Sequence, residues 1–189
     1  MPSFEYDLRY LQAGVDLLED YLLSTDLYWP VGANPPRGEP PYPRMTLSGM
    51  LLADQRLHAL AQTPDEEAKL ARIDEQMDAT RSRWRTAWEQ KCAREFHARL
   101  ALWANFMEDY RQNPGNNADR YAYEVSRRVQ LHLLSQEAGD LPEAETNLLA
   151  GLDKLLQGVF LPGEFIWNAR LASSFPNQVY WYLYGHLRS

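Results

Sequence analysis

Apolar residues recur at helical spacing along most of this chain, beginning close to the N-terminus. From Phe4 to Leu22 they alternate three and four positions apart, with polar and charged residues between them. This spacing places the apolar side chains on one face of an α-helix, so it predicts a helix over residues 4–24. Gly14 lies inside this helix, where glycine costs about 1 kcal/mol relative to alanine. We therefore expect a close crossing with another helix at Gly14.

The longest helical pattern covers residues 64–112 and contains no internal proline or glycine. Thr63 precedes it as an N-cap, Pro64 takes the first helical position and Glu66 completes a capping box. A single helix of this length would extend about 70 Å, which exceeds the width of a compact domain of this size. From Trp84 onwards the apolar spacing changes to steps of four. We expect one stiff helix with different neighbours at its two ends.

Three further helices are predicted, over residues 46–62, over residues 119–137 and from about residue 140 to Gly158. Thr46 is the expected N-cap of the first, and a turn-forming run of asparagine, proline and glycine precedes the second. The third carries six large apolar residues that we expect on its inner side: Leu148, Leu149, Leu152, Leu155, Leu156 and Val159. The fold class predicted is all-α, an irregular bundle of five helices built around the long one.

Two segments interrupt the helical pattern. Residues 29–44 contain half of the twelve prolines, and proline lacks the amide hydrogen that a helix interior needs. We expect an extended loop that Trp29 and Tyr42 hold against the helices. Residues 160–189 are rich in aromatic side chains and predict a loop-rich tail with one or two short helices, although residues 179–184 also alternate as a strand would.

Length, charge and cysteine content narrow the class of protein. The length fits a single helical domain of residues 1–189. A net charge of −7 and a pI near 5.1 disfavour binding to nucleic-acid phosphates. Cys92 is the only cysteine, so neither an intrachain disulfide nor a cysteine zinc site is expected, as is usual in a reducing compartment. Without a signal sequence or a membrane-length apolar run, we expect a cytoplasmic protein that does not bind membranes.

One cluster of arginines stands out on the long helix. At 100° per residue, Arg81, Arg85 and Arg99 fall in the same sector as Trp88. Guanidinium groups on an apolar face need carboxylates, aromatic rings or an anionic ligand as partners. We favour internal ion pairs, with a pocket for a small carboxylate or phosphate as the alternative. A nucleic-acid face is a third interpretation, which would need Arg120, Arg127 and Arg128 on the same surface.

Asp54 and His58 lie four residues apart on the helix over residues 46–62. A carboxylate one turn from an imidazole orients the ring, so this pair could join the arginine pocket, act as a general base or supply two metal ligands. No established metal-binding spacing surrounds it. We favour the interpretation in which Asp54 neutralises one of the arginines and His58 is an interior histidine. No metal, cofactor or catalytic residue is predicted.

The proline-rich loop is a candidate for partner binding through Trp29, Pro36, Pro41 and Tyr42, since its composition resembles ligands of aromatic-lined grooves. A rigid connector packed on the bundle is the alternative. With an over-long helix, many aromatic residues and no catalytic motif, the sequence favours a non-enzymatic protein that acts by association, either as a homodimer or as a helical partner of another protein. The alternative is a bundle that binds, or acts on, a small anionic ligand.

Overall fold

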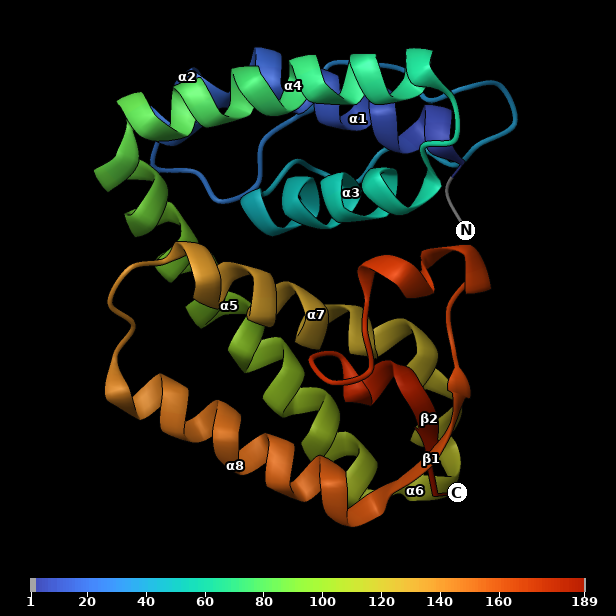
Figure 1. Cartoon of the computed structure of the whole chain (residues 1–189). Coiled ribbons are helices and arrows are strands. Elements are labelled where there is room, and N and C mark those ends of the chain that lie inside the picture. The colour runs from blue at the N-terminus through green and yellow to red at the C-terminus, as the bar shows by residue number, and fades with distance from the viewer. Residues whose placement is uncertain (1–2, 189) are drawn as a thin grey trace.

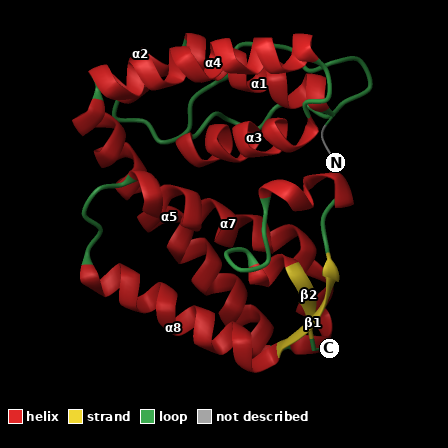
Figure 2. Ribbon diagram, viewed as in Figure 1, coloured by secondary structure: helices red, strands yellow, loops and turns green. Residues whose placement is uncertain are grey.

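The computed structural model describes residues 3–188 and is mostly helical, which confirms the all-α prediction (Figures 1 and 2). The α-helices are α1 (Phe4–Asp16), α2 (Leu18–Leu23), α3 (Leu47–Leu60), α4 (Pro64–Arg83), α5 (Arg85–Gln112), α6 (Pro114–Asn117), α7 (Tyr121–Glu137) and α8 (Glu143–Val159). The described residues also form the short 3-10 helices η1 (Ala118–Arg120), η2 (Ala169–Ser174) and η3 (Trp181–Leu183). Strands β1 (Phe160–Phe165) and β2 (Tyr184–Leu187) pair antiparallel.

The continuous helix predicted over residues 64–112 is wrong, because the chain bends at Trp84. The backbone of Trp84 has φ −113° and ψ 35°, outside the α-helical region. Beyond this residue α5 turns away from the line of α4 and crosses to the other side of the molecule (Figure 1). No proline or glycine marks the bend. It coincides with the change in apolar spacing, and it lets each half bury its own apolar face.

The first predicted helix is also divided, since Leu17 (φ −103°, ψ 0°) separates α1 from α2. The close crossing expected at Gly14 is confirmed. A Cβ atom at this position would lie 3.1 Å from the Sδ and Cε atoms of Met50, which is on α3. Glycine therefore lets α1 and α3 approach one another more closely than alanine would.

The helix ends follow local sequence chemistry. Thr46 accepts a hydrogen bond from the backbone N–H of Gly49, and the capping box of Thr63 and Glu66 is present, as predicted. Helix α5 ends at Gln112, but the asparagine- and glycine-rich run that follows winds into α6 instead of an irregular turn. Helix α8 continues one residue past Gly158.

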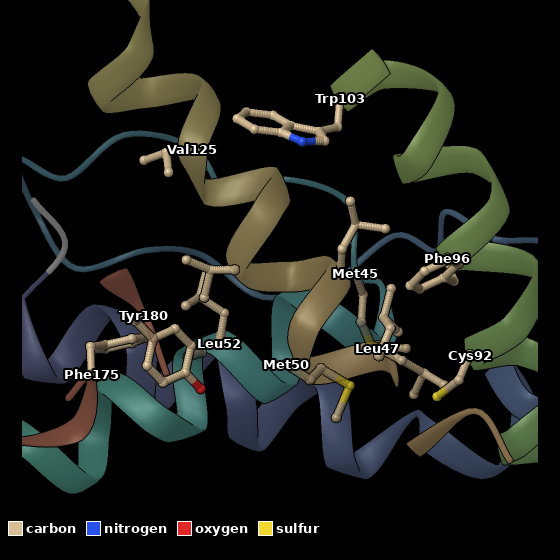
Figure 3. Close-up of a cluster of buried hydrophobic side chains, with 14 of the residues drawn as sticks. Met45, Leu47, Met50, Leu52, Cys92, Phe96, Trp103, Val125, Phe175 and Tyr180 are labelled. Carbon is tan, nitrogen blue, oxygen red and sulfur yellow. The ribbon is translucent and has the colours of Figure 1, made fainter. Parts of the chain in front are cut away.

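The helices form two layers that share one core. Helices α1 to α4 lie on one side, and α5, α7, α8 and the strands lie on the other (Figure 1). Helix α3 packs against α7 and η2 and so connects the layers. Their shared core includes Met45, Leu47, Met50, Leu52, Cys92, Phe96, Trp103, Val125, Phe175 and Tyr180 (Figure 3). Cys92 is fully buried, and burial raises the pKa of its thiol, as suits the apolar role expected of it.

Aromatic residues fill the interior more than the surface. Trp88, Trp103 and Tyr182 are among the largest fully buried side chains. In the tail, the strand pattern over residues 179–184 is mostly wrong, because η3 occupies Trp181–Leu183 and β2 begins afterwards. The tail is nevertheless anchored, since the hydroxyl of Tyr121 donates a 2.6 Å hydrogen bond to the carbonyl oxygen of Tyr182.

Candidate functional site

Three members of the predicted arginine cluster meet at the bend between α4 and α5. Arg81, Arg85 and Trp88 line one cavity of about 310 Å³, together with Glu89 and Glu137. Arg81 lies at the end of α4, whereas Arg85 and Trp88 belong to the first turn of α5. The bend therefore keeps these three side chains together even though the helix is not continuous.

Carboxylates already neutralise the arginines of this cavity. Nη1 of Arg81 lies 3.1 Å from Oε1 of Glu137, and its Nη2 lies 2.8 Å from Oδ1 of Asp78. The indole N–H of Trp88 donates a 3.0 Å hydrogen bond to Glu137, and the guanidinium of Arg81 lies 5.9 Å from the Trp88 ring. Arg85 is 80% exposed and pairs with Glu89 at 2.8 Å. An anionic ligand would have to displace these carboxylates, so the geometry favours the internal ion pairs.

Arg99 does not line this cavity. Its side chain is 13% exposed, and its Nε donates a 2.7 Å hydrogen bond to Glu95, which is almost fully buried. The remaining guanidinium nitrogens reach Gln130 at 2.7 Å and Thr46 at 3.0 Å. Glu95 also accepts hydrogen bonds from the backbone N–H and the hydroxyl of Ser48 in the first turn of α3. Arg99 is thus part of a network that joins α3, α5 and α7.

Asp54 and His58 do not line the arginine cavity; they lie against α4. The Nε2 atom of His58 lies 3.6 Å from Oδ1 of Asp54 and 3.2 Å from Oδ2 of Asp74. His58 is 53% exposed, so it is not the interior histidine that we expected. Within residues 3–188 no arginine forms an ion pair with Asp54, which differs from the neutralising role expected for this residue. The acidic partner is Asp74, which lies on a different helix and has no sequence spacing that would reveal it.

The Asp54–Asp74 pair is electrostatically unfavourable when both carboxyl groups are ionised. Burial, and then the neighbouring charge of Asp74, raise the pKa of Asp54 to about 8. The Oδ1 atoms of both residues are buried and accept no hydrogen bond. This cluster (Asp54, His58 and Asp74) is therefore a place where a proton or a cation is strongly favoured.

The proline-rich loop packs on the bundle, as the connector interpretation requires. Trp29 and Met45 exchange backbone hydrogen bonds of 3.0 and 2.8 Å. The ring of Tyr42 lies 4.7 Å from that of Tyr6, and the hydroxyl of Tyr6 donates a 3.4 Å hydrogen bond to the carbonyl oxygen of Pro41. Pro36 is half-buried and Pro41 is exposed. The ring of Trp29 lies 6.2 Å from that of Tyr21, so both aromatic residues proposed for partner binding pack within the chain.

An apolar groove lies between α3, α7 and η2. It has a volume of about 620 Å³, and its walls include Leu52, Tyr123, Trp167 and Leu171. Arg56 is the cation at its edge, but its guanidinium makes a bidentate pair with Asp7 at 2.6 and 2.8 Å. A ligand in this groove would find little unpaired polarity to orient it.

The outer face of α8 departs most clearly from the sequence prediction. Of the 17 residues of this helix, Leu152 and Leu156 are buried. Leu148 and Leu155, which we expected on the inner side, are 48% and 54% exposed. Helical spacing correctly predicted a helix rich in apolar residues. It could not show that the rest of the molecule covers only one side of this helix.

Comparisons with protein-family models, with curated proteins and with solved structures found no match to this chain. None of the helices formed by residues 3–188 combines the length and the apolar character needed to cross a bilayer. A functional proposal for this chain therefore rests on its own geometry.

Proposed function

We propose that this chain acts by association, and that a second copy of the chain binds to the outer face of α8. The observation that carries the proposal is the exposure of Leu148 and Leu155 on a 17-residue helix whose other apolar side packs against α5. An apolar face without a partner inside the molecule is typical of an interaction surface.

The exposed positions form a regular seam. Ala144, Leu148, Gly151, Leu155 and Gly158 are all exposed and are spaced four, three, four and three residues apart. This is the spacing of helices that pack side by side, and no ionisable residue interrupts it. Nothing lies within 4 Å of a Cβ atom built at Gly151 or Gly158, so another helix can approach the backbone there.

The seam is complementary to itself in an antiparallel arrangement. If two copies of α8 cross near Gly151, Leu148 of one copy lies against Leu155 of the other, and Ala144 lies against Gly158. Such a contact is isologous, because a two-fold axis uses the same surface from both subunits. The order of large and small residues along α8 therefore favours a homodimer over an unrelated helical partner.

A hollow beside the seam offers a further contact. Met107, Tyr110, Leu155 and Val159 line a cavity of about 170 Å³ between α5 and α8. A leucine from the second copy can enter such a hollow, as knobs enter holes in packed helices. Leu148 and Leu155 of both copies are four half-exposed leucines, and burying their exposed halves contributes about 4 kcal/mol to the free energy of association. This gain is small relative to the loss of translational and rotational freedom on binding. We therefore expect a weak dimer whose population depends on concentration.

Sedimentation velocity over micromolar to millimolar concentrations tests the proposal. The wild-type chain is expected to shift from monomer to dimer as its concentration rises. Leu155→Glu is expected to abolish this shift, because it would place a charge in the seam.

Leu23→Glu is the matched control. Leu23 is as exposed as Leu155, at 54%, but lies on α2 in the other layer. The Leu23→Glu variant should therefore still form the dimer. A wild-type chain that remains monomeric throughout, or equal loss of the dimer in both variants, would contradict the proposal.

A further inference from the structure

Asp54, His58 and Asp74 converge from two helices onto one point. Asp54 and His58 lie one turn apart on α3, and Asp74 faces them from α4. One ligand atom from each side chain, a carboxylate oxygen or an imidazole nitrogen, lies within 4.8 Å of the other two. The cluster is separate from α8 and plays no part in the proposed association.

We propose that these three side chains bind one divalent transition-metal ion. A tetrahedral ion with bonds of 2.0–2.1 Å separates its ligand atoms by about 3.3–3.4 Å. The observed separations from Nε2 of His58, 3.2 Å to Asp74 and 3.6 Å to Asp54, lie on either side of this value. All three atoms lie within 4.8 Å of one another, so side-chain rotations can place them around one ion.

The charges around the cluster also favour a cation. The Oδ1 atoms of Asp54 and Asp74 are buried without a hydrogen-bond donor. Arg81, a cation on the same helix as Asp74, is paired with Asp78 and Glu137. The two side chains are 21% and 29% exposed, so water screens them only in part, and the carboxylates repel each other unless a proton or a positive ion lies between them. A divalent ion bound by Oδ1 of Asp54 and Oδ2 of Asp74 would neutralise both carboxylates and would give Oδ1 of Asp54 a partner.

The donor set indicates which ions fit. Calcium and magnesium prefer ligands made entirely of oxygen, whereas an imidazole with carboxylates suits zinc, manganese, iron or cobalt. Because His58 is half-exposed, the ion has a path from solvent, and water can complete its coordination. The bound ion would link α3 to α4 through the carboxylates of Asp54 and Asp74.

Zinc binding to the purified chain, free of any affinity tag, tests this inference. Equilibrium dialysis should give one zinc ion per chain, and zinc at 100 times its Kd should raise Tm by about 5–10 °C. Magnesium should have little effect. Asp74→Asn and His58→Gln should each remove the zinc-dependent rise in Tm, because each leaves only two ligands.

His97→Gln is the matched control. His97 is also an exposed histidine beside a carboxylate, with Nδ1 2.6 Å from Oε1 of Glu145, but it is not part of the cluster. This variant should bind zinc as the wild type does. If Asp74→Asn does not fold, His58→Gln decides, because the exposed ring contributes little packing. No zinc bound by the wild type at micromolar free metal, or binding retained in His58→Gln, would overturn the inference.

Discussion

Three arginines that share one helical sector in the sequence occupy three different environments. Arg81 is half-buried between carboxylates, Arg85 is on the surface and Arg99 is deep in a polar network. Helical spacing correctly indicated that these residues need partners. It could not predict their burial, because burial depends on where α3 and α7 cross the helix and on the bend at Trp84.

Substitution of the most buried arginine of this group, Arg99, and of the most exposed, Arg85, should have very different effects on stability. Arg99→Ala should lower the free energy of unfolding by about 3–5 kcal/mol, because it leaves the buried carboxylate of Glu95 without its cation. Arg85→Ala should change it by less than about 0.5 kcal/mol, as expected for an exposed residue. Urea denaturation of both variants measures the difference. Similar losses in the two variants would contradict the burial assigned to Arg99.

The carboxyl group of Asp54 should make metal-free stability depend on pH. Its pKa is 3.8 in an ordinary environment and about 8 in the folded chain. Between these values the folded state binds more protons than the unfolded state, so stability falls as pH rises. Asp54→Asn should remove this fall and stabilise the metal-free protein by on the order of 2 kcal/mol at pH 8.

The groups that face Asp54 are His58 on its own helix and Asp74, Asp78 and Arg81 on α4. Urea denaturation from pH 4 to pH 9, with a chelator present, separates the contribution of Asp54 from that of a metal. A wild-type profile with the same slope as that of Asp54→Asn would show that Asp54 is not the titrating group. The same variant should lose zinc binding, since the amide cannot replace the charged ligand.

At the scale of the element, helix ends were more predictable than helix continuity. Thr46 and Thr63 cap their helices as predicted, because capping depends on hydrogen bonds between residues three positions apart. The breaks at Leu17 and Trp84 have no such local cause. They depend on which surfaces the two halves of each helix cover, and this is a property of the packed molecule.

Two helical glycines should respond differently to alanine. Gly151→Ala on α8 should stabilise the monomer by about 0.5–1 kcal/mol, because the added methyl group meets no neighbour and alanine favours the helix. Gly14→Ala should gain less or destabilise, because its methyl group would press against Met50. Thermal unfolding at low micromolar concentration, where the chain is monomeric, compares them. A larger gain for Gly14→Ala would contradict the close crossing of α1 and α3.

At the scale of the whole molecule, α3 holds the two layers together and supplies the candidate metal ligands Asp54 and His58. The sequence predicted the helical class and most of the elements, but not this central position. It identified Asp54 and His58 as a pair and missed Asp74, because side chains on separate helices meet only after the layers assemble. The sequence analysis also placed all the leucines of α8 on the inner side. Helical spacing shows that these residues are apolar, but it does not show whether they face the core or a partner.

The position of α8 at the outer edge of one layer determines what a pair of molecules would look like. Because α3 and α4 belong to the opposite layer (Figure 1), joining two copies along α8 leaves both histidine–aspartate clusters at the far ends of the assembly. The pair would present two identical ends, well separated and facing in different directions.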